Sequence, residues 1–309
     1  MSCAHPIPAI DLGYKINKNG ETVRNIKLLD MNFKHIGYGL EELKAKYGES
    51  LILLPCGKCY SCGIDYSRMW ASRILLEAQA HLCSCFITLT YSDTFCPDKL
   101  SKRDIQLFIK RLRKEVGSIR YFLCGEYGEK SSIDSLTGHG RPHYHAIIFG
   151  YDFPDKEILS KSKSGNMIYR SPLLERLWPF GISSIGLLTP ESAQYVAKYS
   201  LKKKTTGFDF GEFVLMSRRP GIGLNGYSED IWRTDKIYVE GKTYKPPRYF
   251  EKVAQKLDHF TYDIAKSERE IRARNYKSRK YMYGLQREED VLKYENDIRI
   301  YNDALKVRL

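Results

Sequence analysis

Two histidines separated by one residue, His143 and His145, are the pair of side chains in this sequence best placed to do chemistry. Aromatic, β-branched and apolar residues fill positions 143–149, and Gly150 ends the run, so a strand is expected there. Because side chains alternate across a strand, both imidazoles share one face, and the residues between them face the core. Two imidazoles on one rigid element supply half of a divalent-metal site, although such a pair also occurs as two hydrogen-bonded surface or core histidines.

A third ligand is expected from the preceding strand. Residues 119–126 have strand character, and a polar, glycine-containing loop connects them to the histidine strand, so the two strands should form an antiparallel pair. This pairing brings Glu126 close to His143 and completes a site with two nitrogen ligands and one oxygen ligand. Glu129, a few residues into the loop, is the rival carboxylate, and either acid is alternatively an exposed loop residue.

Two tyrosines on a later helix are candidate nucleophiles. Thr189 and Pro190 are typical of a helix start, and the helix should run to about residue 203. Tyr195 and Tyr199 are four residues apart, so they share one helical face. Tyrosines at this spacing also occur as half-buried packing residues. Lys198 and Lys202 lie beside the face; for Lys198 a solvated helix lysine is the alternative.

A cysteine cluster precedes these elements. Cys56, Cys59 and Cys62 form a C-x2-C-x2-C pattern, and three thiolates this close need one more ligand for tetrahedral zinc. Cys3 is the first candidate for that ligand, and His5 is the second. An iron–sulfur pattern would place another cysteine four residues after the third, where none stands. Structural zinc and reduced thiols near a turn both remain open.

The remaining pattern predicts an α+β fold, with a central antiparallel sheet, flanking helices and a charged helical C-terminal tail. Leu82 would close the buried face of the first of these helices. The expected domains are an N-terminal segment with the cysteine cluster (1–62), a catalytic domain (63–250) and the tail (251–309). The other expected elements are a short strand or hairpin near 23–29, helices at 64–82, 101–117 and 171–178, and strands at 85–91 and 181–188.

Composition favours a nucleic-acid partner. The chain of 309 residues has a net charge of +13, with 23 Tyr and 13 Phe interleaved among Lys and Arg. This combination provides phosphate contacts and stacking surfaces for single strands, although a solvated basic surface would have the same charge. No apolar run approaches the ~20 residues of a membrane span, and no signal peptide is evident. A cytosolic protein without a membrane partner is expected, with its eight cysteines reduced or metal-bound.

The ordered motifs resemble those of the HUH endonucleases, which initiate rolling-circle replication. The strand 86–91 resembles their first motif, the His143–His145 strand their second, and the Tyr195–Tyr199 helix their two-tyrosine third motif. The resemblance spans about residues 55–247 and is strongest to the replication initiators of gokushovirus-type microviruses, which are small single-stranded DNA phages. The cysteine cluster, positions 124–130 and positions 217–223 contribute to it.

This resemblance implies an RRM-like core and a site-specific endonuclease that starts and terminates rolling-circle replication of a phage genome. Tyr195 or Tyr199 attacks the origin strand and keeps its 5′ phosphate, and the two tyrosines alternate between rounds. Lys198 neutralises charge on the phosphate, and Glu126, His143 and His145 bind Mg²⁺ or Mn²⁺. The implied partners are single-stranded origin DNA and the helicase and polymerase of the host, in the bacterial cytoplasm. The expected DNA contacts are Thr88, Thr90, Lys202, Arg218 and Arg219.

Two other functions fit parts of the sequence. A module that binds single-stranded nucleic acid without cutting it accounts for the charge and the aromatic residues, but leaves the ordered His and Tyr motifs as accidents. A metal-dependent phosphohydrolase that uses water needs the histidines but no tyrosine. Phenylalanine substitutions at Tyr195 and Tyr199 separate these hypotheses, because only a tyrosine nucleophile leaves DNA covalently attached to the protein.

Overall fold

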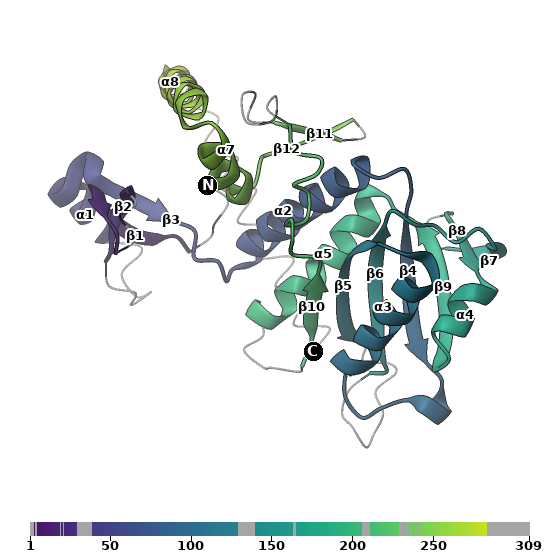
Figure 1. The fold of residues 1–309 in the computed structure, drawn as a ribbon. Coiled ribbons are helices and arrows are strands. Elements are labelled where there is room, and N and C mark those ends of the chain that lie inside the picture. Colours follow the sequence, from purple (N-terminus) through teal and green to yellow (C-terminus); the bar gives the residue numbers. More distant parts are fainter. Residues whose placement is uncertain are drawn as a thin grey trace. The chain divides into compact units, whose positions relative to one another are not determined.

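A computed structural model gives the fold (Figure 1). It describes residues 3, 5–18, 20, 22–29, 39–128, 140–162, 165–205, 211–228, 231, 234, 236–239 and 241–282, and it omits most side chains of 198–205 and 273–282. The fold is α+β and is built around a seven-stranded sheet, as the sequence predicts. Contacts divide the chain into two units, one of residues 1–227 with 236–247 and one of residues 228–235 with 248–309.

The N-terminal part forms a separate three-stranded sheet. Its order is β2-β1-β3, where β1 is Ile7–Ile16, β2 is Thr22–Leu28 and β3 is Leu51–Leu54. The helix α1 (Gly39–Tyr47) lies between β2 and β3 in the sequence. The expected hairpin near 23–29 is confirmed as the β1–β2 pair, whereas β3 has no alternation and is recognised only through its pairing with β1.

The seven-stranded sheet is antiparallel throughout, with the order β10-β5-β6-β4-β9-β8-β7. Its middle strands are those predicted from the sequence, and each is bordered on both sides by a partner. The strands are β4 (Ser84–Tyr91), β5 (Arg120–Tyr127), β6 (Pro142–Phe149), β7 (Glu157–Lys161), β8 (Met167–Arg170), β9 (Gly181–Leu187) and β10 (Phe213–Met216).

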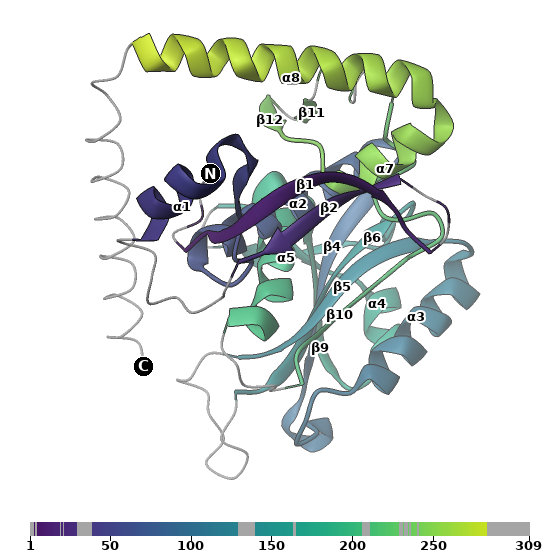
Figure 2. The same cartoon turned by 90° about the vertical axis from the view of Figure 1, so that its left-hand side faces the viewer.

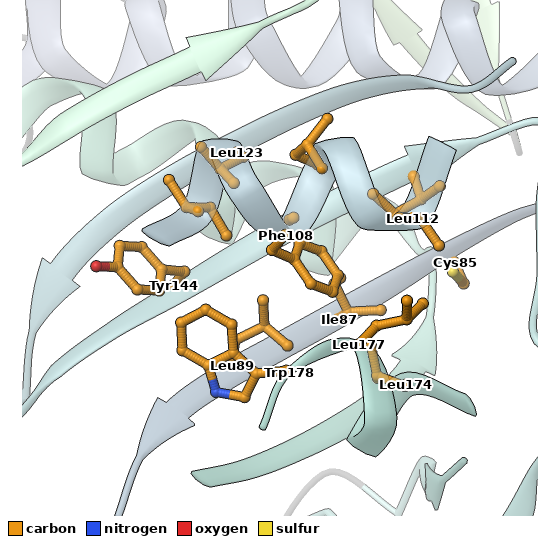
Figure 3. Packing of buried hydrophobic residues seen from close by; sticks show 14 of the residues in the cluster. Cys85, Ile87, Leu89, Phe108, Leu112, Leu123, Tyr144, Leu174, Leu177 and Trp178 are labelled. Atoms are coloured by element: carbon orange, nitrogen blue, oxygen red, sulfur yellow. The ribbon is translucent and has the colours of Figure 1, made fainter. Parts of the chain in front are cut away.

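One face of this sheet is covered by α3 (Lys102–Val116) and α4 (Pro172–Leu177) (Figure 2). The side chain of Ser101 accepts a hydrogen bond from the Asp104 amide and so begins α3, and Gly117, with φ 86°, ends it, as predicted. Figure 3 shows how side chains of both helices meet β4 and β6 in the main hydrophobic core, with Phe108 and Trp178 fully buried.

The opposite face is covered by α2 (Tyr60–Gln79) and α5 (Pro190–Thr205), which pack against each other. Small and aliphatic side chains of both helices are buried at these contacts, among them Ala71 and Ala197. The prediction of a helix at 64–82 was wrong at both ends. Cys59 takes an extended backbone as the N-cap, which starts the helix earlier, and the chain turns after Gln79 to enter β4. Leu82, expected on the buried face, is therefore exposed.

The second unit is helical where the structure describes it. Its helices are α7 (Arg248–Leu257) and α8 (His259–Met282), as expected for the charged tail. The short hairpin of β11 (Ile237–Val239) and β12 (Lys242–Tyr244) belongs to the first unit. Among the described residues, no helix combines the length and hydropathy that crossing a bilayer requires.

Candidate active site

The register of three strands positions the candidate metal ligands. β5 and β6 are antiparallel, as predicted, with Glu126 opposite His143 and Cys124 opposite His145. On the other side of β6, Thr88 of β4 is opposite His145. Since side chains alternate, the two histidines and Glu126 project from the face covered by α2 and α5. Tyr144 projects from the other face into the core, also as predicted.

The three ligand groups converge on one point. The Nε2 atoms of His143 and His145 lie 3.0 Å and 2.9 Å from Oε1 of Glu126, and the candidate ligand atoms all lie within 4.8 Å of one another. Glu126 is 2% exposed and His145 is 6% exposed. A carboxylate and two imidazoles that are buried together, on strands held by neighbours on both sides, form a rigid and preorganised donor set.

Hydrogen bonds at the other ring nitrogens orient both imidazoles. Nδ1 of His143 lies 3.1 Å from the carbonyl oxygen of Arg141, so it must carry the proton, which leaves Nε2 with its lone pair. Nδ1 of His145 lies 3.0 Å from Oγ1 of Thr88, and the ring of Phe86 stacks on this imidazole at 5.5 Å. Metal-binding histidines are commonly held in this way through their second nitrogen.

Burial and charge shift the pKa values of the group. Burial opposes ionisation of Glu126, but hydrogen bonds and charge from His143 and His145 outweigh it and hold the pKa of Glu126 below its ordinary value. Burial lowers the pKa of His145, and the neighbouring Glu126 offsets this only in part. Both shifts favour an ionised carboxylate beside a neutral imidazole, the protonation state in which these groups bind metal.

The donor set fits a divalent cation. Two imidazole nitrogens and one carboxylate oxygen suit Mn²⁺ and other first-row ions, and three protein ligands leave positions for phosphate oxygens. Glu129, the rival to Glu126, lies outside the described residues. In the described part of the chain, only one other group of at least three such side chains is close enough to bind a metal: Cys3, Cys56, Cys59 and Cys62.

The tyrosine helix lies beside this site. Thr189 begins α5 by accepting a hydrogen bond from the Ser192 amide, as predicted, and Val196 and Ala197 are buried. The ring of Tyr195 meets the ring of His145 edge-on, with centroids 5.1 Å apart, and Tyr195 is 42% exposed. The backbone of α5 includes Lys198, Tyr199 and Lys202, as predicted, but their side chains lie outside the description.

The remaining predicted DNA contacts lie in two places. Thr90 is opposite His143 on β4, so it shares the site's face with Thr88. Arg218 and Arg219 are exposed in the loop after β10. The role of Thr88 in orienting His145 was not predicted, because a hydrogen bond between residues 57 apart leaves no local signal. Only the alternation of β4 placed Thr88 on the relevant face.

Comparison with known proteins identifies the family. Residues 84–204 match the model of a family of replication-associated proteins that is described by its ORF2 members. The chain is 30% identical over 304 residues to replication-associated protein ORF2 of Spiroplasma virus 4, covering 87% of this chain and 86% of that protein. It is 32% identical over 223 residues to replication-associated protein ORF4 of Chlamydia phage 1, covering 66% of this chain and 54% of that protein.

A third relative, replication-associated protein VP4 of Bdellovibrio phage phiMH2K, is 30% identical over 215 residues, covering 64% of this chain and 66% of that protein. No solved structure matches the chain significantly. The extended match to the Spiroplasma virus protein shows that the chain belongs to the family of microvirus replication-associated proteins.

Proposed function

We propose that this protein is a replication initiation endonuclease that nicks and rejoins single-stranded origin DNA through a 5′-phosphotyrosine intermediate. It would thereby start and terminate rolling-circle replication of a phage genome. Its relatives are named as replication-associated proteins of three bacterial viruses. The observation that carries the proposal is the juxtaposition of the Glu126, His143 and His145 group with the ring of Tyr195.

The bonds and charges of the reaction balance without an added energy source. The phenolic oxygen of Tyr195 or Tyr199 loses its proton and attacks phosphorus in line with the 3′ oxygen. The P–O3′ bond breaks, the 5′ phosphate stays on tyrosine, and the 3′ hydroxyl is free to prime synthesis. The phosphotyrosine ester conserves the energy of the phosphodiester, so the reverse attack by a 3′ hydroxyl rejoins a strand without ATP.

The strand residues hold the scissile phosphate in place. Mg²⁺ or Mn²⁺ bound by Glu126, His143 and His145 would withdraw charge from the phosphate oxygens. Thr88 keeps His145 in the ring orientation that turns Nε2 toward Glu126. Because the strands are locked on both sides, this geometry needs no rearrangement when DNA binds, which lowers the entropic cost of alignment.

The helix residues provide the nucleophiles. Tyr195 stands over the imidazole of His145 and is accessible to solvent. Tyr199 follows one helical turn later, which permits one tyrosine to hold a 5′ end while the other cuts the regenerated origin. Lys198 is proposed to neutralise charge on the phosphate. Thr90, Lys202, Arg218 and Arg219 are proposed to contact the DNA.

Charge and aromatic content support the substrate. A net charge of +13 attracts a polyanion, and 23 tyrosines offer stacking surfaces for unpaired bases. The host helicase and polymerase are the proposed partners that extend the 3′ hydroxyl, in the cytoplasm of the bacterium. A binding module without cleavage activity is the second candidate; it is favoured by the same charge and aromatic content but assigns no role to the Glu126, His143 and His145 group.

A denaturing gel tests the proposal. The full chain is incubated with 5′- or 3′-labelled single-stranded DNA from the phage origin and Mn²⁺, with and without a chelator. A DNA label that migrates at protein mass, requires the metal and disappears in the Tyr195→Phe/Tyr199→Phe variant is the expected result. Hydrolysed DNA without a covalent band would indicate a water-dependent phosphohydrolase. A shift on a native gel with neither product would indicate the binding module.

A further inference from the structure

The second candidate metal group lies far along the chain from the proposed catalytic residues. It consists of Cys3, which precedes β1, Cys56 and Cys59, which follow β3, and Cys62, in the first turn of α2. The four sulfur atoms all lie within 4.8 Å of one another. None of these four described residues forms a disulfide bond, so the proximity of their side chains requires another explanation.

The sulfur separations match the edges of a zinc tetrahedron. The Cys56–Cys62 and Cys3–Cys59 sulfur pairs are 3.9 Å and 3.8 Å apart. A zinc ion with Zn–S bonds of about 2.3 Å has sulfur ligands about 3.8 Å apart, whereas a disulfide would bring two sulfurs to about 2.05 Å. An iron–sulfur cluster would place its cysteines farther apart, because each would bind a different iron atom.

Backbone amides surround the same sulfur atoms. The amides of Lys58 and Cys59 point at Sγ of Cys56 from 3.4 Å and 3.3 Å, and the amide of Cys56 points at Sγ of Cys3 from 3.3 Å. Gly57 makes this turn possible, since its φ of +70° is one that other residues rarely adopt. Amide hydrogen bonds to sulfur stabilise thiolates, so the turn is built for the metal-binding form of cysteine.

We propose that Cys3, Cys56, Cys59 and Cys62 bind one structural Zn²⁺ ion. Four protein ligands close the coordination sphere and leave no position for substrate, which distinguishes this site from the Glu126, His143 and His145 group. The ion would tie the residue ahead of β1 to the start of α2. That helix packs along α5, where the hydroxyl of Ser67 donates to the carbonyl of Gln194, the residue before Tyr195.

The zinc content of the untagged full chain tests this proposal without DNA or nicking. Elemental analysis after gel filtration should find one zinc per chain that depends on the cysteines, and a thiol-blocking mercurial should release it. The Glu126→Ala/His143→Ala variant should retain this zinc. Cys56→Ser/Cys59→Ser should lose it, whereas the matched control Cys83→Ser, at an exposed cysteine outside the cluster, should keep it.

Cobalt substitution keeps the proposal testable even if the double serine variant does not fold. The wild-type chain refolded with Co²⁺ should show the intense visible bands and the thiolate-to-cobalt charge transfer of a tetrahedral sulfur site. The proposal would be overturned by wild-type protein that carries no zinc, by iron in its place, by zinc that survives Cys56→Ser/Cys59→Ser, or by a weak octahedral cobalt spectrum. None of these results depends on whether the protein cuts DNA.

Discussion

Two buried glutamates meet the same face of the central sheet at its opposite ends, and their partners differ in kind. Glu126 on β5 faces the Nε2 atoms of two histidines. Glu77 on α2 binds Arg120, at the other end of β5, together with His81 and the Gly223 amide. Six residues of extended strand separate Arg120 from Glu126, about 20 Å.

The chemistry of the partners indicates the role of each carboxylate. Arg120 carries a permanent charge and also donates to the carbonyl of Pro220 at 2.7 Å, so Glu77 is neutralised inside the protein and holds the 217–225 loop. The imidazoles beside Glu126 carry no permanent charge and are ligands in their neutral form. We interpret the Glu77 end as a structural clamp and the Glu126 end as a site for a charged ligand.

Removing the carboxylate charge at the Glu126 end should have the largest effect on activity. Glu126→Gln keeps the shape of the side chain but removes the anionic ligand, so covalent tyrosine–DNA product at low Mn²⁺ should fall by more than about 100-fold. The denaturing-gel assay across a Mn²⁺ titration measures this loss, and urea unfolding shows whether the variant is folded. Undiminished product at every Mn²⁺ concentration would remove Glu126 from the proposed site.

At the Glu77 end, the largest effect should be on stability instead. Glu77→Ala leaves the guanidinium of Arg120, which is 14% exposed, without its buried carboxylate, so the free energy of unfolding should fall by about 3–5 kcal/mol. Mn²⁺ affinity should stay unchanged because the metal site lies at the other end of the strand. Urea unfolding and a Mn²⁺ titration measure the two quantities.

Glu115→Ala is the matched control for this clamp. Glu115 pairs with Arg176 on the surface at 2.7 Å, where both side chains are largely accessible, so its loss should cost less than about 1 kcal/mol. Equal losses for Glu77→Ala and Glu115→Ala would contradict the interpretation of Glu77 as a buried clamp.

The two ends also differ in how far the sequence predicts them. The Glu126 end follows from local patterns, since alternation places His143 and His145 on one face and a short connection pairs their strand with that of Glu126. The Glu77 end joins residues 43 apart, and its loop contacts span about a hundred more; periodicity carries no record of such pairings. The same reason explains why β3 was missed, since it becomes a strand only by pairing with β1.

Thr88→Val should have a smaller effect on the metal site than Glu126→Gln. It keeps the shape of the β4 side chain but removes the hydrogen-bond partner of His145 Nδ1, so the imidazole is less well oriented. Mn²⁺ affinity should fall by about 10–100-fold. Isothermal titration measures the affinity, and Thr88→Ser, which retains the hydroxyl, should restore most of it. Equal affinities for Thr88→Val and the wild type would show that strand packing alone orients the ring.

The smallest expected effect is a dependence of stability on pH, measured without Mg²⁺ or Mn²⁺. Because burial lowers the pKa of His145, the unfolded chain takes up a proton below pH 6.5 that the folded chain excludes until a lower pH. The Glu126 pKa is also lowered, so its contribution is present above its ordinary value of 4.5 and is lost as pH falls through the folded value.

Both groups therefore make acid destabilising, by about 1.4 kcal/mol for each unit of pKa shift. Urea unfolding at pH values from 8 down to about 5 measures the slope. His145→Gln should flatten it between pH 7 and 5, whereas His259→Gln, at an exposed residue of α8, should leave it unchanged. A slope that His145→Gln does not alter would mean that the folded protein accepts a proton on His145 as easily as the unfolded chain. The imidazole of His145 would then be less dry than its burial between Phe86 and Tyr195 implies.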